Sequence, residues 1–132
     1  MKVICVKDNI LHCKRCYKDM LISNKISVYY EAIKQLKQVS FGDLILLYHN
    51  DWKVIAVGFA ISDILTNDML KDDIESFIYV NWIFKSDDDL KNTIDYRKIA
   101  DGKAPPKSIS PIYSLNKEKL FEEISKNQKQ II

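Results

Sequence analysis

Apolar residues in this sequence follow two spacings, one typical of strands and one of helices. Largely apolar runs over 2–6, 44–48, 54–61 and 77–84 are rich in β-branched and aromatic residues and predict four strands. The run over 44–48 has no polar interruption, as expected of a strand covered on both faces. Only a short polar break separates the second run from the third, so these two strands are expected to pair as a hairpin.

Helical spacing occurs in three other places. Apolar residues three and four positions apart predict a short helix over 10–19 and an amphipathic helix over 28–37. A closing helix is predicted over 116–124, with Asn116 or Ser114 as its N-cap. These helices and strands, in this order, predict an α+β fold with a mixed or mainly antiparallel sheet that curls into a pseudo-barrel.

The 132 residues contain no internal repeat, so residues 1–132 are expected to form one domain. A composition of 47% hydrophobic and 29% charged residues excludes an intrinsically disordered chain. No apolar run approaches the roughly 18–20 residues of a membrane helix, and the first residues lack a signal-peptide core. Cys5, Cys13 and Cys16 are odd in number, which fits a reducing compartment. We therefore expect a soluble cytoplasmic protein.

Charge is distributed unevenly along the chain. Residues 1–42 carry a balance of +5, residues 43–95 of −7 and residues 96–132 of +4. If both ends of the chain meet on one side of the fold, that side is cationic, as expected of a surface that binds a phosphate backbone. The alternative is a chance pattern of surface charge.

Motifs for catalysis are weak. Cys13 and Cys16 form a lone Cys-x-x-Cys, whereas zinc prefers four ligands, and the alternative is two ordinary helix cysteines. The acidic run over 87–89 is more typical of a solvated turn than of a metal site, because adjacent residues do not converge on one ion. With only 3 glycines the chain has no phosphate-binding glycine loop. We expect no enzyme activity, no metal and no cofactor.

Trp52 stands at the tip of the predicted hairpin, among polar residues. A tryptophan in a polar turn exposes a large apolar surface, so it is a candidate for stacking on a nucleobase. The alternative is that its ring folds back onto the core. The sequence leaves both open.

Two stretches resemble a known group of nucleic-acid-binding domains. The string Phe-Ile-Tyr-Val-Asn-Trp-Ile-Phe-Lys over 77–85, followed by an acidic turn and a closing helix, resembles the carboxy-terminal half of YTH domains. The string Asp-Leu-Ile-Leu-Leu-Tyr-His-Asn over 43–50, with Val-Gly-Phe-Ala over 57–60, resembles the central hairpin of YTH and EVE domains. Both families have a PUA-like fold.

The resemblance implies a reader of modified nucleobases. The leading expectation is a DNA-binding module that flips a methylated base, N6-methyladenine or a modified cytosine, into a pocket. Such a module would be the specificity domain of a modification-dependent restriction system of the McrB type, cut from or associated with a motor or nuclease. The alternative is an RNA-binding PUA- or YTH-like module acting on methylated RNA or with an RNA-modifying enzyme. A third possibility is a domain that binds a protein partner.

The resemblance also implies which residues form the site. The base pocket is expected at the turn after the first strand, the segment after the first helix and the loop after the hairpin, with two residues from the sheet. The pocket residues are Val6, Lys7, Asp8, Asn9, Met20, Leu21, Ile22, Ser23, Tyr48, Met69 and Trp82. The residues expected to contact the nucleic-acid backbone are Lys14, Arg15, Lys18, Trp52, Lys103 and Lys107.

This sequence departs from the YTH pattern at the aromatic cage. Of the two positions where YTH domains carry cage tryptophans, one holds Met20 or Leu21, and for the other Met69 and Leu70 are the nearest candidates. The stacking face would then come from another aromatic residue, with Tyr17, Tyr29, Tyr30, Tyr48 and Trp82 as candidates. The departure leaves the identity of the modified base open.

Overall fold

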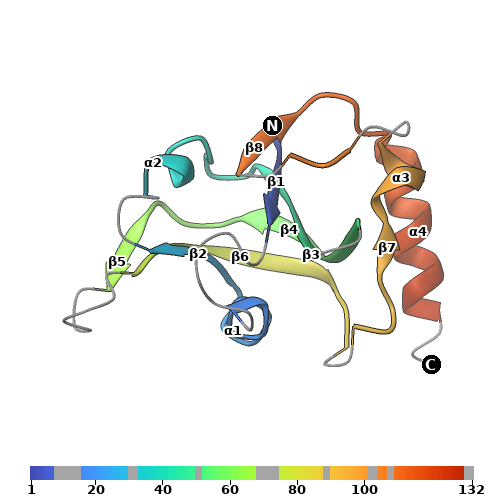
Figure 1. Cartoon of the computed structure of the whole chain (residues 1–132), viewed down its shortest axis with the longest axis horizontal. Helices are drawn as coiled ribbons and strands as arrows, with labels where there is room; N and C mark the ends of the chain where they lie inside the picture. Colours follow the sequence, from blue (N-terminus) through green and yellow to red (C-terminus); the bar gives the residue numbers. More distant parts are fainter. Residues whose placement is uncertain are drawn as a thin grey trace.

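The computed structural model describes residues 1–7, 16–29, 33–49, 52–67, 75–87, 90–100, 104–106 and 109–129. Strands and helices follow one another along the chain; among the described elements, α4 is the longest helix and β6 is the longest strand (Figure 1). The elements are β1 (Val3–Lys7), α1 (Cys16–Ile22), β2 (Lys25–Tyr29), α2 (Ile33–Leu36), β3 (Leu44–His49), β4 (Lys53–Ala60), β5 (Leu65–Asn67), β6 (Glu75–Lys85), β7 (Ile94–Asp95), α3 (Tyr96–Ile99), β8 (Ser110–Ile112) and α4 (Lys117–Lys129).

The strands form one mixed sheet in the order β2-β6-β4-β3-β1-β8. β1 and β3 are parallel, with Lys7 opposite Tyr48, and the other neighbours in the sheet are antiparallel. β5 pairs with the first part of β6, and β7 pairs with the start of β4. Figure 1 shows the strongly curved sheet, with α3 and α4 together at one end of the molecule. The predicted α+β fold with a curled mixed sheet is confirmed.

Alternate residues of the central strands feed two cores, one on each face of the sheet. On β3, Ile45 and Leu47 belong to one buried cluster and Leu44 and Leu46 to the other. This alternation explains the uninterrupted apolar run, because both faces of the strand are covered. Each fully buried aliphatic side chain contributes about 1.5–3 kcal/mol to stability.

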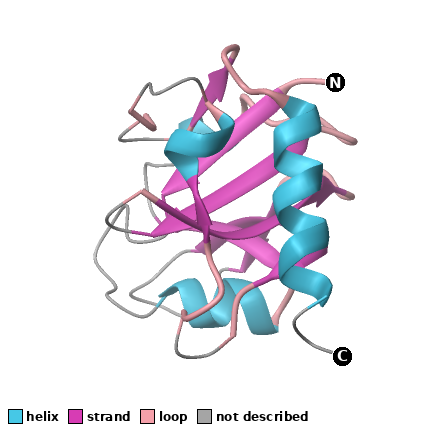
Figure 2. Cartoon of the chain, turned by 90° about the vertical axis from the view of Figure 1, so that its right-hand side faces the viewer, coloured by secondary structure: helices cyan, strands magenta, loops and turns pink. Residues whose placement is uncertain are grey.

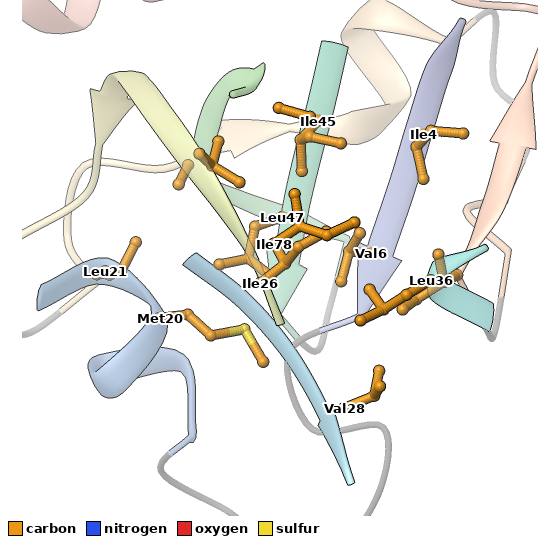
Figure 3. Packing of buried hydrophobic residues seen from close by; sticks show 14 of the residues in the cluster. Ile4, Val6, Met20, Leu21, Ile26, Val28, Leu36, Ile45, Leu47 and Ile78 are labelled. Carbon is orange, nitrogen blue, oxygen red and sulfur yellow. The ribbon is translucent and has the colours of Figure 1, made fainter. Parts of the chain in front are cut away.

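The first cluster lies inside the curl of the sheet, and helices cover the second. Figure 3 shows residues of β1, β2, β3, α1 and α2 meeting in the first cluster. The second cluster includes Tyr96 and Ile99 of α3 and Leu120 and Ile124 of α4. In Figure 2 α4 runs along one side of the strands. Both helices therefore close the outer face of the central sheet.

Gly58 allows β4 and β6 to approach closely. A Cβ atom on Gly58 would lie 2.3 Å from the backbone oxygen of Asn81 and 2.8 Å from Cγ1 of Val80. Here the β4–β6 register also shifts, between Val57 and Gly58. This glycine is required by the close approach of the neighbouring backbone.

Several predicted elements are confirmed and others need correction. The hairpin of β3 and β4 is confirmed, and Asn116 caps α4, accepting a hydrogen bond from the backbone N–H of Lys119 at 3.1 Å. The helix predicted over 28–37 is wrong at its start, because Val28 lies in β2, and within the described residues the helix spans Ile33–Leu36. The first helix begins at Cys16 in the described residues and ends at Ile22, three positions beyond the prediction.

Besides β2, four short elements were not predicted at all. β5 lies in the segment expected to be a long loop, β7 and α3 precede the proline-containing region, and β8 lies within it. All four are short, so they carry too few residues for a periodic pattern. Among the described residues, no helix is long and apolar enough to cross a membrane.

Candidate nucleic-acid interface

The carboxyl ends of the parallel strands β1 and β3 meet at one edge of the sheet, beside the beginning of α1. Lys7 ends β1, His49 ends β3, and Tyr17 lies in the first turn of α1. The Tyr17 and His49 rings have centroids 5.2 Å apart and planes tilted by 57°. We call Tyr17 and His49 the strand-end cluster. It offers aromatic surface of the kind on which bases stack, and Lys7, whose register partner is Tyr48, ends the neighbouring strand.

Two side chains of β6 hold the last turn of α1 in place. Trp82 donates from Nε1 to the carbonyl oxygen of Met20 at 3.2 Å, and Lys85 donates from Nζ to the carbonyl oxygen of Leu21 at 3.0 Å. The last carbonyls of a helix lack partners within it, and a cation there also favours the helix dipole. These bonds fix α1 against β6 and so help to position Tyr17.

Four residues predicted to line the base pocket are buried. Val6, Met20 and Leu21 pack in the first core cluster, with at most 8% exposure. Tyr48 is 4% exposed, and its hydroxyl donates a hydrogen bond to the carbonyl oxygen of Pro106. A covered side chain offers no open face to a base, so in this structure these four residues belong to the packed interior and do not line an open pocket.

Two other predicted pocket residues, Ser23 and Trp82, line the same surface hollow. The hollow has a volume of about 430 Å³ and lies between the turn after α1 and the middle of β6. Its cation, Lys85, is already bonded to Leu21 and to Asn24 Oδ1 at 3.2 Å. Ile22, which precedes the lining residue Ser23 in the sequence, is 74% exposed. The lining residues are Ser23, Asn24, Ile61, Tyr79, Val80, Asn81, Trp82 and Lys85.

Some of the predicted site residues are described only in part or lie outside the described residues. Lys18 is described, and it is half-buried on α1, one position after Tyr17. The side chain of Tyr29 is not described, although its backbone ends β2. The following predicted site residues lie outside the described part of the chain: Asp8, Asn9, Lys14, Arg15, Tyr30, Met69, Lys103 and Lys107. Their roles stay predictions.

Trp52 packs back onto the protein. Its ring meets Tyr96 edge to face, with centroids 6.3 Å apart, and the guanidinium of Arg97 lies 5.6 Å from its ring centroid. The backbone of Trp52 has a φ of 64°, which is uncommon for a bulky residue, and its carbonyl accepts a hydrogen bond from the Tyr96 N–H at 2.9 Å. Of the two readings of Trp52, the structure supports a ring folded onto the core.

Sequence reasoning missed a buried polar cluster between β2 and β6. Glu75 Oε2 accepts a hydrogen bond from the Ser27 hydroxyl at 2.7 Å and lies 2.7 Å from Lys25 Nζ. Burial by itself would lower the pKa of Lys25, but the hydrogen bond and charge of Glu75 outweigh burial and raise it. The available signal was the alternation of Lys25 and Ser27 with apolar neighbours, which the helical spacing over 28–37 masked.

No group of side chains suited to a metal ion occurs within the described ranges. Cys5 is fully buried in the second core cluster, and burial raises the pKa of its thiol, so it is inert. Cys13 lies outside the described residues, and the side chain of Cys16 is not described. The role of the Cys-x-x-Cys pair therefore stays a prediction.

Comparison with known proteins identifies the fold. No family model and no curated protein matches the sequence. Among solved structures, the chain is similar to the Pho92 YTH domain in complex with m6A and to the YTH domain of Zygosaccharomyces rouxii MRB1 in complex with N6-methyladenosine RNA. Each match has a TM-score of 0.55 and 12% identity, and covers 96% of this chain and 86% of the other.

The CPSF4-YTH domain of Toxoplasma in apo form matches equally well, with a TM-score of 0.55, 12% identity and coverage of 95% and 86%. The likeness extends over nearly the whole chain, so it concerns the complete arrangement of strands and helices. This chain therefore has a YTH-like α+β fold.

Proposed function

We propose that this chain is a binding module that reads a methylated base in single-stranded RNA. The observation that carries the proposal is the YTH-like fold over almost the entire chain, because two of the matched structures are described as complexes with N6-methyladenosine or its RNA. That ligand favours RNA over the modified DNA and the restriction system expected first from the sequence. No catalytic step and no cofactor enter the proposal.

The strand-end cluster is the proposed place for the base. The half-buried Tyr17 ring, which packs against His49, is the proposed stacking surface, and Lys7 ends the neighbouring strand β1. Stacking on an aromatic ring is worth about 1–3 kcal/mol per base. The hollow beside Trp82 is a less suitable place, because its cation is committed to the end of α1.

Reading a methyl group needs more than stacking. One buried methyl contributes only about 0.8 kcal/mol, or about fourfold in affinity. Larger discrimination requires a close fit together with hydrogen bonds to the remaining N–H and the ring nitrogen of the base. We therefore expect a preference for methylated over plain RNA of about fourfold or more.

The test is fluorescence anisotropy with short single-stranded RNAs that carry N6-methyladenine, 5-methylcytosine or no modification. DNA strands of the same sequence form the second arm. Tighter binding of one methylated RNA than of both its plain form and its DNA counterpart is expected. Equal binding to all RNAs would overturn base reading, and a preference for modified DNA would restore the reading first expected from the sequence.

A further inference from the structure

A hollow of about 240 Å³ lies at the end of the sheet where β7, α3 and α4 meet the start of β4. Three of its lining residues are cations, Lys53, Arg97 and Lys98, and Trp52 and Thr93 also line it. Lys53, Arg97 and Lys98 are exposed. A concave surface rich in positive charge is suited to an anionic group.

Arg97 is held in a fixed position at this hollow. Its Nε donates to Asp95 Oδ1 at 3.1 Å and its Nη2 donates to Asp95 Oδ2 at 3.0 Å, while its guanidinium lies over Trp52. These bonds use two of the five N–H groups of the guanidinium. No other partner of the guanidinium is found in the described part of the chain, so three donors are available to a ligand.

Both carboxylates that line the hollow are already neutralised. Asp95 is bonded to Arg97 and also caps α3, accepting from the Arg97 backbone N–H at 3.0 Å. Glu123 has a side-chain exposure of 12%, and its Oε1 lies 3.4 Å from Lys126 Nζ. Lys53 and Lys98 form no salt bridge with any residue that the structure describes. The hollow therefore keeps an excess of positive charge.

The hollow adjoins the strand-end cluster through the β3–β4 hairpin. His49 of the cluster is paired with Lys53 in the register of the hairpin, and Lys53 is paired in turn with Asp95 of β7. A bound RNA strand that runs from Tyr17 past His49 would reach Lys53 next. The two places thus lie along one path over the end of the sheet.

We propose that this hollow binds a backbone phosphate of the RNA, on a nucleotide next to the one whose base lies at the strand-end cluster. The ligand is a phosphodiester, bound by Arg97, Lys53 and Lys98. The face of Trp52 is occupied by Arg97, so the ring orients the guanidinium and does not stack on a base. This inference rests on the proposed function.

The test uses the full chain and a double variant, Lys53→Glu with Lys98→Glu. Lys34→Glu with Lys37→Glu is the matched control, since both lysines are exposed, lie in or just after α2 and give the same change in net charge. Each protein is titrated with a methylated RNA of nine nucleotides and with a methylated trinucleotide. Circular dichroism verifies that both variants are folded.

For the nine-nucleotide RNA, the Lys53/Lys98 variant is expected to bind about tenfold more weakly than the control variant, as loss of charge-assisted hydrogen bonds requires. Its affinity should also depend less steeply on salt concentration. For the trinucleotide, the two variants should differ little. Equal weakening of nine-nucleotide binding in both variants would overturn the phosphate site.

The two proposals fail in different ways. If the wild type binds methylated and plain RNA equally, base reading fails, and a selective loss in the Lys53/Lys98 variant would still support the phosphate site. If the wild type discriminates the methyl group but the Lys53/Lys98 variant behaves like the control, the phosphate site fails and base reading stands.

Discussion

Trp82 donates a hydrogen bond from its indole to the carbonyl oxygen of Met20, 62 positions earlier in the chain. This bond connects β6 to the last turn of α1, the helix that carries Tyr17 of the strand-end cluster. The position of a candidate binding residue therefore depends on a contact with a distant strand. The contact can be removed without changing Tyr17 itself.

Trp82→Phe should lower the free energy of unfolding by about 1 kcal/mol, because the Met20 carbonyl loses its partner. Urea denaturation followed by fluorescence or circular dichroism measures this loss. Tyr113→Phe serves as the control, since Tyr113 is 90% exposed and should change stability by less than about 0.5 kcal/mol. Equal stability of the two variants would contradict a structural role for the indole N–H.

Tyr17→Ala should weaken binding of the methylated RNA by about 1–3 kcal/mol, the value of one stacked base. Tyr113→Ala is the matched aromatic control and should leave affinity unchanged, because Tyr113 lies outside the strand-end cluster. Tyr79→Ala tests the hollow beside Trp82, which Tyr79 lines with 42% exposure. A loss of binding in Tyr79→Ala but not in Tyr17→Ala would move the base to that hollow.

Gly58→Ala should destabilise the protein by about 1–3 kcal/mol or more, because its Cβ would collide with the backbone of Asn81. Gly42→Ala is a useful comparison. Gly42 has a φ of 86° and open space around it, so alanine there meets only backbone strain of about 1–2 kcal/mol. Thermal unfolding should rank Gly58→Ala as the less stable variant, and the reverse order would show that β6 moves aside at no cost.

Asp43 should make the free energy of unfolding depend on pH in the acidic range. Burial would raise the pKa of its carboxyl, but hydrogen bonds from the backbone N–H groups of Ser40 and Lys2, at 2.8 and 2.9 Å, outweigh burial and lower it. A lowered folded-state pKa contributes stability above the unfolded pKa, and this contribution is lost as pH falls through the folded pKa.

Asp43→Asn should therefore be less stable than the wild type at pH 7, by about 1.5–3 kcal/mol, and should lose less stability on acidification. Denaturant titrations at several pH values between 7 and 3 measure both effects. Parallel losses in the two proteins on acidification would show that another carboxylate is responsible.

Glu75→Gln should destabilise the fold because the Lys25 ammonium, with a side-chain exposure of 13%, loses its nearer and buried carboxylate and, among the described residues, keeps only Asp19 Oδ2, at 3.5 Å. The amide oxygen of glutamine can still accept from Ser27, so the loss reports mainly on the charge. Lys25→Met combined with Glu75→Gln should recover part of the stability, because the largely buried cation that lost its nearer partner is removed as well. Chemical denaturation of the single and double variants checks this, and additive losses would contradict coupling between the two residues.

Spacing along the chain located the long elements with regular burial, although α4 ends at Lys129, five positions beyond its predicted end at 124. The run over 44–48 predicted a doubly covered strand, and Ile45 and Leu46 do lie in opposite cores. Asn116 predicted the start of the last helix, because a cap depends on residues three positions apart. The hairpin and the α+β class followed from the same local signals.

The tertiary structure decided what depends on residues far apart in sequence. The start of the segment with helical spacing over 28–37 forms part of β2 instead, because pairing with β6 buries Ile26 and Val28 and brings Lys25 to Glu75. The local sequence predicts that Trp52 is an exposed turn residue, whereas in the folded chain its ring packs against Tyr96 and Arg97. A one-dimensional pattern records which side chains share a face of one element, whereas the energy of these contacts comes from elements that only the folded chain brings together.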